Sequence, residues 1–166
     1  MRKIALTTLL AAALGLAGCA GVIRTQPAPG DTVETVLSKM GKPAAIYPEG
    51  DGQEFEYATG PMGQYTFMAH IGPDQRLRGF EQVLSAEGFG RIKIDVASKD
   101  EVLRLIGHPA ERSRVALNDY EVWSYRYKEN GVWNSMMHVH FDSAGVVRMM
   151  MNGPDPMYEE KRFFRD

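Results

Sequence analysis

Two segments of the chain repeat the same arrangement of apolar and polar residues. Residues 32–43 (TVETVLSKMGKP) align without gaps on residues 98–109 (SKDEVLRLIGHP), which lie 66 positions later. In the first segment, apolar side chains recur from Val33 to Met40 at the i, i+3, i+4, i+7 spacing that places them on one face of a helix. We therefore expect two short amphipathic helices at corresponding positions of an internal repeat.

Residues that begin and end helices stand at the expected places in both segments. A Ser, Thr or Asp side chain can accept hydrogen bonds from the amides at a helix start, and a glutamate three residues later completes a capping box. A glycine in the left-handed conformation ends many helices, and a proline beyond it prevents the helix from resuming. These residues are Asp31 or Thr32, Glu34, Gly41 and Pro43 in the first segment, and Ser98, Glu101, Gly107 and Pro109 in the second.

Each predicted helix is followed by segments in which apolar and polar residues alternate, which is the pattern of β-strands. Turn residues such as Gly60-Pro61 and Asn130-Gly131 separate these segments. The strand-like segments are residues 54–59, 64–71 and 76–84 after the first helix, and residues 121–127, 136–141 and 146–151 after the second.

This order of elements predicts an α+β fold of two tandem repeats, each a helix followed by a sheet of three or four antiparallel strands. We place the first repeat at residues 31–86, the second at residues 87–152, and a C-terminal tail at residues 153–166. The helix of each repeat should cover one face of its sheet and leave the other face exposed to water.

The N-terminal segment, residues 1–18, has the features of an export signal. Arg2 and Lys3 precede a run of apolar and small residues that is shorter than the roughly 20 residues a membrane span requires. Cys19 follows this run and is the only cysteine of the chain, so it has no intrachain disulfide partner. Residues 19–30 begin with this cysteine and are rich in Pro, Gly, Gln and Thr, a composition typical of a flexible tether.

Residues 16–19, Leu-Ala-Gly-Cys, resemble the lipobox of bacterial lipoprotein signal peptides. The resemblance implies cleavage before Cys19, acylation of its thiol, and attachment to a membrane through chains that contribute about 0.8 kcal/mol per buried methylene. Ala20 stands where an aspartate would signal retention in the inner membrane, so the implied location is the periplasmic face of the outer membrane of a Gram-negative bacterium. The alternative is an ordinary secretory signal with a chance cysteine.

Composition narrows the possible partners. The chain has 19 Lys and Arg against 21 Asp and Glu, a formal net charge of −2, and two of its cations belong to the predicted signal. It contains no basic block of the kind that binds a phosphate backbone, so no nucleic-acid partner is expected. No segment after residue 19 is apolar enough to predict a membrane span.

The repeated motifs resemble the SmpA/OmlA/BamE group of small outer-membrane lipoproteins. The resemblance rests on the helix ending in an apolar residue, Gly, any residue and Pro, on the EVWSY strand at residues 121–125, and on Phe141-Asp142 before a turn. It covers roughly residues 30–151. It implies a β-lactamase-inhibitor-protein-like fold and a non-enzymatic role in outer-membrane protein assembly or envelope integrity, with envelope or barrel-assembly proteins as partners.

No arrangement of residues in the sequence points to catalysis. No serine lies in a Gly-x-Ser-x-Gly motif, no phosphate-binding glycine loop opens a helix, and we expect no cofactor and no small-molecule substrate. His138 and His140 lie two apart in a predicted strand, and alignment of the repeats places His70 level with His140. They could form a zinc or copper site, but no carboxylate or cysteine has a recognisable ligand spacing, so we interpret them as ordinary strand residues.

Aromatic and methionine residues concentrate in the second repeat and raise the question of a binding surface. Trp123, Tyr125 and Tyr127 alternate with polar residues, so we expect them in the core beneath the second helix. Five methionines could form an adaptable contact surface, although alternation along a strand predicts that about half of them are core. They are Met136, Met137 and residues 149–151.

Two functional hypotheses of different classes follow. The first is a lipid-anchored binding module that acts as a scaffold in outer-membrane assembly. The second is a lipid-anchored inhibitor or sensor that presents its sheet to a periplasmic enzyme. Residues 157–166 of the tail mix charged and aromatic residues, and this segment could dock on the domain, bind a partner or fray.

Overall fold

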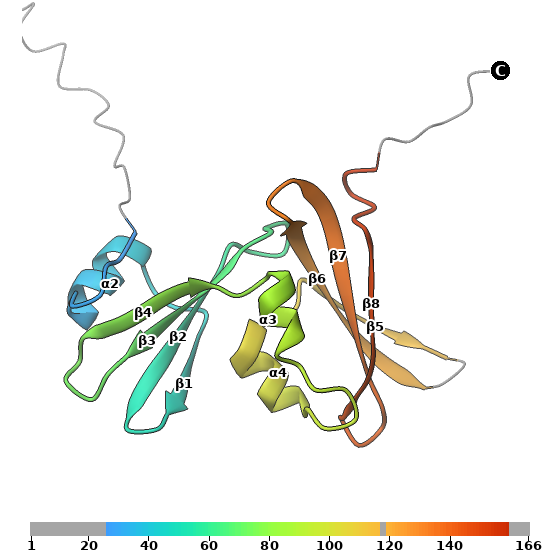
Figure 1. Cartoon of the computed structure of the whole chain (residues 1–166), viewed down its shortest axis with the longest axis horizontal. Helices are drawn as coiled ribbons and strands as arrows, with labels where there is room; N and C mark the ends of the chain where they lie inside the picture. The colour runs from blue at the N-terminus through green and yellow to red at the C-terminus, as the bar shows by residue number, and fades with distance from the viewer. Residues whose placement is uncertain (1–25, 117–118, 160–166) are drawn as a thin grey trace, which may run out of the picture.

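Two four-stranded antiparallel sheets form the framework of the molecule (Figure 1). The computed structural model describes residues 26–116 and 119–159; the predicted signal, Cys19 with most of the tether, and residues 160–166 of the tail lie outside the described residues. In each sheet the strands are hydrogen-bonded in chain order. The α+β class predicted from the sequence is therefore confirmed.

The helices and strands form two consecutive groups along the chain, and each group contains one sheet. The first group is α2 (Val33–Met40) with β1 (Ala45–Glu49), β2 (Gly52–Ala58), β3 (Thr66–Ile71) and β4 (Leu77–Gln82). The second is α3 (Ala86–Gly90) and α4 (Lys99–Ile106) with β5 (Glu111–Val115), β6 (Tyr120–Glu129), β7 (Trp133–Phe141) and β8 (Val147–Pro154). No helix within the described ranges is long and apolar enough to cross a membrane.

Of the two caps predicted for α2, Asp31 and Thr32, the structure forms the second, so the capping box expected from Asp31 with Glu34 is not formed. Thr32 caps α2, and its hydroxyl accepts a hydrogen bond from the Thr35 amide. Asp31 is not the cap, because its carboxylate instead accepts hydrogen bonds from the Ala28 amide at 2.9 Å and from Lys39 Nζ at 2.6 Å. At α4, Ser98 and Glu101 form the predicted capping box.

Both helices end at the predicted glycines, but the glycine conformation is not the left-handed helical one. Gly41 has φ 83° and ψ −161°, and Gly107 has φ 77° and ψ −165°. This extended region at positive φ is populated almost only by glycine, so it restricts the residue type more strongly than the left-handed helical region does.

The helix α2 covers one face of the first sheet. Val36 of α2 packs with Phe55, Ala69, Ile71 and Leu77 in a buried cluster. These strand residues alternate with polar ones, as the sequence pattern predicted. The opposite face of this sheet was expected to be exposed, yet Met68 and Glu56 on that face are fully buried. They are buried because α4 and the residue after its end pack there.

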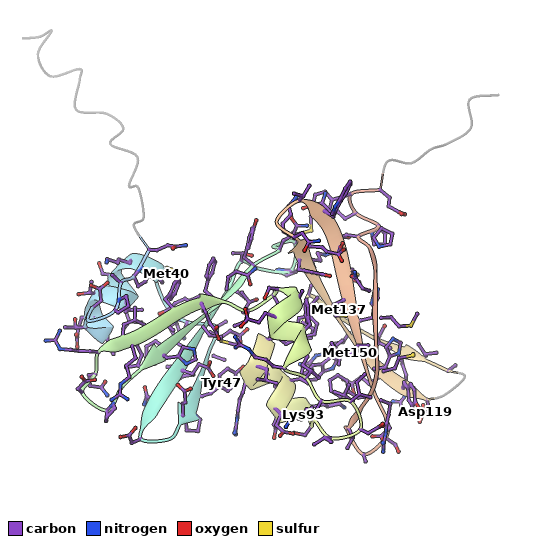
Figure 2. All side chains as sticks on the ribbon, in the orientation of Figure 1. Met40, Tyr47, Lys93, Asp119, Met137 and Met150 are labelled. Atoms are coloured by element: carbon purple, nitrogen blue, oxygen red, sulfur yellow. The ribbon has the colours of Figure 1, made fainter. Side chains whose placement is uncertain are left out.

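A second, larger core lies between α4 and the second sheet. Helices α3 and α4 stand between the two sheets (Figure 1), and Figure 2 shows Met137 and Met150 on the side of the second sheet that faces them. Trp123, Tyr125 and Tyr127 are buried here, which confirms their predicted core role. Other members of this core are Met68, Val83, Leu84, Phe89, Val102, Ile106, Val139, Phe141 and Val147.

Candidate functional site

The junction between the two sheets is built around a buried carboxylate. Glu56 of β2 is 0% exposed. One of its oxygens accepts a hydrogen bond from the His108 amide at 2.9 Å, while the other accepts one from Tyr47 Oη at 2.7 Å and lies 2.8 Å from His108 Nδ1. Burial raises the pKa of Tyr47, and the hydrogen bond to Glu56 raises it further, so the hydroxyl keeps its proton and donates to Glu56. A buried polar group requires such partners, and here the contacts with His108 join the first sheet to the segment after α4.

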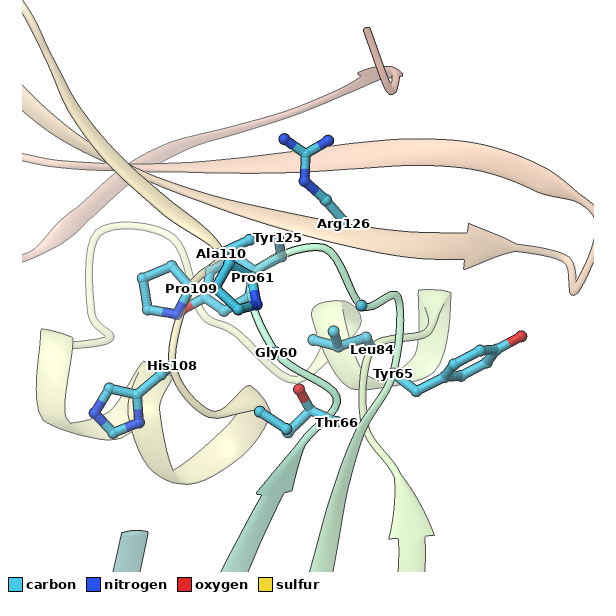
Figure 3. Close-up of a pocket in the computed structure, with 12 residues that line it drawn as sticks. Gly60, Pro61, Tyr65, Thr66, Leu84, His108, Pro109, Ala110, Tyr125 and Arg126 are labelled. Atoms are coloured by element: carbon cyan, nitrogen blue, oxygen red, sulfur yellow. The ribbon is translucent and has the colours of Figure 1, made fainter. Parts of the chain in front are cut away.

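A small cavity lies beside this junction (Figure 3). It is lined by the β2–β3 loop around Gly60 and Pro61, by His108 and Pro109 after α4, and by Tyr125 of β6. The Tyr125 hydroxyl donates to the Gly107 carbonyl at 3.1 Å. The cavity measures about 170 Å³, which is below the roughly 300–1,000 Å³ of typical small-molecule sites. We therefore regard it as a packing gap at the junction.

A larger cleft of about 420 Å³ opens between the first sheet and α4, with His70 in it. His70 Nδ1 lies 3.0 Å from Glu49 and 3.6 Å from Glu54, and its Nε2 lies 3.7 Å from Glu81. Burial alone would lower the pKa of His70, but the hydrogen bond to Glu49 and the surrounding carboxylates outweigh it, so the pKa is raised. Arg91 pairs with Glu81 at 2.8 Å. The charges of this cleft therefore largely neutralise one another.

The three histidines of interest do not come together. His70 lies in the cleft of the first sheet, whereas His138 and His140 lie on the face of the second sheet that points away from α4. His138 Nδ1 is 2.8 Å from Ser124 Oγ. Burial lowers the pKa of both His138 and His140. In residues 26–116 and 119–159, no group of three or more His, Cys, Asp or Glu is arranged to hold a metal ion.

The β2–β3 loop meets the β6–β7 turn at the upper edge of the molecule in Figure 1, and both segments carry exposed apolar side chains. Gln64 Nε2 donates to Asn134 Oδ1 at 2.9 Å and ties the loop to the turn. We call the four exposed residues of these two segments the apolar tip: Met62 at 65% exposed, Tyr65 at 40%, Val132 at 65% and Trp133 at 67%.

Sequence reasoning missed the apolar tip. Asn130-Gly131 was recognised as a turn, and the structure confirms positive φ at both residues. The large apolar residues beside the turn carry no periodic signal, because a turn breaks the alternation of the strands. Only the contact between Gln64 and Asn134, which are 70 residues apart, shows that the segments of Met62 and Trp133 lie beside each other.

The first residues of the predicted tail belong to the folded domain. Strand β8 continues to Pro154, and the carboxylate of Asp155 is fully buried against the guanidinium of Arg126. The Asp155 amide also donates to the Asn134 carbonyl at 3.0 Å. The predicted boundary between the second repeat and the tail at residue 153 is therefore too early, and the last residues of the domain lie next to the apolar tip.

Comparison with known proteins adds little to this description. No protein-family model matches the chain, and no curated protein matches it. The crystal structure of a DUF4309 family protein, YjgB from Bacillus subtilis, is similar with a TM-score of 0.27 at 12% identity. The similarity covers 74% of this chain and 76% of that one. At this TM-score the similarity supports no conclusion about the fold or the function.

Proposed function

We propose that this protein is a lipid-anchored, non-catalytic binding module that faces the periplasm and acts as a scaffold in outer-membrane protein assembly or envelope integrity. The observation that carries the proposal is the apolar tip. Trp, Tyr and Met are the residue types enriched at the centres of protein interfaces, whereas a tryptophan exposed to 67% contributes little to the stability of the isolated chain.

The two segments of the apolar tip are held in place by polar contacts that are buried or partly buried. Gln64 and Asn134 join the loop to the turn, and Asp155 with Arg126 fixes the chain beside them. Glu56 and His108 tie the two sheets together behind the tip. A surface that is ordered before binding loses less conformational entropy on association, so a small apolar area can supply useful affinity.

The predicted anchor complements a small binding surface. The predicted tether ends before residue 30, because Pro27 is buried and the Gly30 amide donates to the Leu77 carbonyl at 2.8 Å. Acyl chains on Cys19 and a tether of residues 19–26 would keep the domain within about 15 Å of the membrane on average. Confinement to this layer raises the effective concentration toward membrane-bound partners without any additional contact. A modest interface at the apolar tip is then sufficient.

The fold proposed for this module is a tandem pair of BamE-like, β-lactamase-inhibitor-protein-like units. Three parallels between the two sheets support it. Each sheet has four antiparallel strands in chain order after a helix. Each third strand has a register shift at a corresponding place, between His70 and Ile71 and between His140 and Phe141. The helix caps form equivalent bridges, Thr32 with Arg76 and Ser98 with Val146.

Copurification from detergent extracts of the cell envelope tests the proposal. The full lipidated chain should retain barrel-assembly or other outer-membrane assembly proteins, and Val132→Ser/Trp133→Ser should lose them. The matched control is Ile94→Ser/Val96→Ser, because these residues are also exposed and apolar, at 48% and 63%, but belong to the segment before α4. Equal capture by the wild type and the tip variant would contradict the assignment. Capture of a single soluble periplasmic enzyme would favour the inhibitor or sensor hypothesis instead.

A further inference from the structure

Two histidines and two methionines face one another on the outer surface of the second sheet. In the antiparallel pair of β7 and β8, His138 lies opposite Met151 and His140 lies opposite Met149. Directly opposed residues have Cβ atoms about 4.5–5.5 Å apart, and residues two apart on one strand are about 7 Å apart on the same face. The four side chains therefore occupy the corners of a small quadrilateral, which we call the His–Met patch.

All four residues of the His–Met patch point to the same side, away from the core. Met137 and Met150, their neighbours on the same two strands, pack against the core under α4, as Figure 2 shows. Because side chains alternate along a strand, His138, His140, Met149 and Met151 project from the opposite face. Met149 and Met151 are 36% and 51% exposed, so the patch can be reached from solution.

We propose that the His–Met patch binds a single copper(I) ion. Two imidazole nitrogens and two thioether sulfurs make up its donor set. The carboxylate of Glu111, in the same cross-strand row as His138, is paired with the guanidinium of Arg126. Thioethers are soft, uncharged donors that favour soft cations such as copper(I), whereas hard cations such as magnesium and calcium require oxygen donors. The uncharged donor set also suits a monovalent ion better than a divalent one, since it supplies no negative charge.

A second observation points to a ligand at the same place. His140 is only 7% exposed, and its Nδ1 atom is buried with no hydrogen-bond partner among the residues that the structure describes. Buried polar atoms are nearly always satisfied, so an orphan on a histidine calls for an explanation. A bound metal ion would give His140 Nδ1 the partner that it lacks among the described residues.

The neighbouring histidine is already oriented as a ligand would be. Ser124 Oγ lies 2.8 Å from His138 Nδ1, on the adjacent strand β6. Metal-binding histidines commonly use one ring nitrogen for a hydrogen bond that fixes the ring and the other for the metal. This contact leaves Nε2 of His138 as the donor. The register also explains why sequence spacing did not indicate the site: the sulfur donors are on β8, and no carboxylate or cysteine is involved.

Copper(I) titration against a chromophoric competitor under anaerobic conditions tests the proposal. Every protein in the experiment is the full chain in detergent with Cys19→Ser, because Cys19 that is not acylated carries a thiol that would itself bind copper(I). We expect one copper(I) per chain, with an affinity that falls by more than about tenfold in Met149→Leu/Met151→Leu. The matched control is Met137→Leu/Met150→Leu, which removes two sulfurs from the same strands on the other face and should bind as tightly as the parent.

Each outcome decides the proposal. Failure of the parent to compete for copper(I), or an equal loss in the two methionine pairs, would overturn it. Zinc(II) binding as tight as copper(I) binding and insensitive to Met149→Leu/Met151→Leu would also overturn it, because the thioethers would then have no role. Silver(I), a redox-inert soft cation, should shift the methyl NMR signals of Met149 and Met151 and leave those of Met137 and Met150 in place. This readout is independent of the apolar tip and of the lipid.

Discussion

The two helix-ending glycines offer a controlled test of how the sheets are joined. Gly41 and Gly107 have nearly the same backbone conformation, at φ 83° and 77° and ψ −161° and −165°. Substitution by alanine imposes the same strain at both, about 1–3 kcal/mol, because this region is almost closed to residues with a Cβ atom. The two positions differ only in what the new methyl group meets.

At Gly41 the added Cβ would have nothing within 4 Å, whereas at Gly107 it would lie 2.9 Å from the carboxylate of Glu56 and 2.9 Å from Thr66 Cγ2. Glu56 cannot move away cheaply, because Tyr47 and His108 hold it on both oxygens. Overpacking of this kind typically costs about 1–3 kcal/mol. Gly107→Ala should therefore lose that amount of unfolding free energy in addition to the loss of Gly41→Ala.

Urea unfolding followed by circular dichroism on the full chain in detergent measures both losses. A melting-temperature difference of about 2–4 °C per kcal/mol should accompany them. Equal destabilisation by the two substitutions, or a larger loss at Gly41, would refute the packing of Glu56 against the end of α4.

Two further predictions concern the anchor and the cleft. Cys19→Ser should prevent acylation and the usual cleavage before residue 19, and any matured product should leave the membrane fraction. Intact mass spectrometry of the wild type should show acyl chains on Cys19, and an unmodified native thiol would contradict the proposed anchor. Because the pKa of His70 is raised in the folded state, its ion pairs stabilise the fold fully below about pH 6.5. This contribution is lost as the pH rises through the folded pKa. In urea unfolding, His70→Gln should therefore destabilise the protein more at about pH 6 than at about pH 9. A penalty that grows with pH would contradict this sign.

The elements with strong local signals were predictable from the sequence. Helices α2 and α4 lie within the two aligned segments, and Ser98 with Glu101 forms the expected capping box. Their apolar spacing, caps and terminal glycines all indicate the same structure. Strands β1 and β5 were less visible, because neither contains a buried residue and so neither shows the alternation of core and surface positions. Helix α3 is five residues long and contains two glycines, so it lacks helical periodicity.

The candidate sites depend on tertiary contacts that local patterns do not encode. Glu56 occupies a position that alternation assigns to the exposed face, and it is buried only because the end of α4 packs on it. The His–Met patch depends on the register of β8 against β7, which includes a shift after His140. The apolar tip requires Gln64 and Asn134 to meet. These facts arise when separate elements pack together, so no single segment predicts them.

Site-specific photocrosslinking in living cells tests the central claim most directly. A photoreactive phenylalanine analogue replaces Trp133 in the full lipidated chain, and the same analogue at Val96, another exposed apolar position, serves as the control. The proposed function predicts a discrete adduct with an outer-membrane assembly protein from position 133 and none from position 96. Absence of a protein adduct at position 133 in a folded, membrane-bound chain, or equal adducts at both positions, would contradict the claim that the apolar tip is the binding surface of a scaffold.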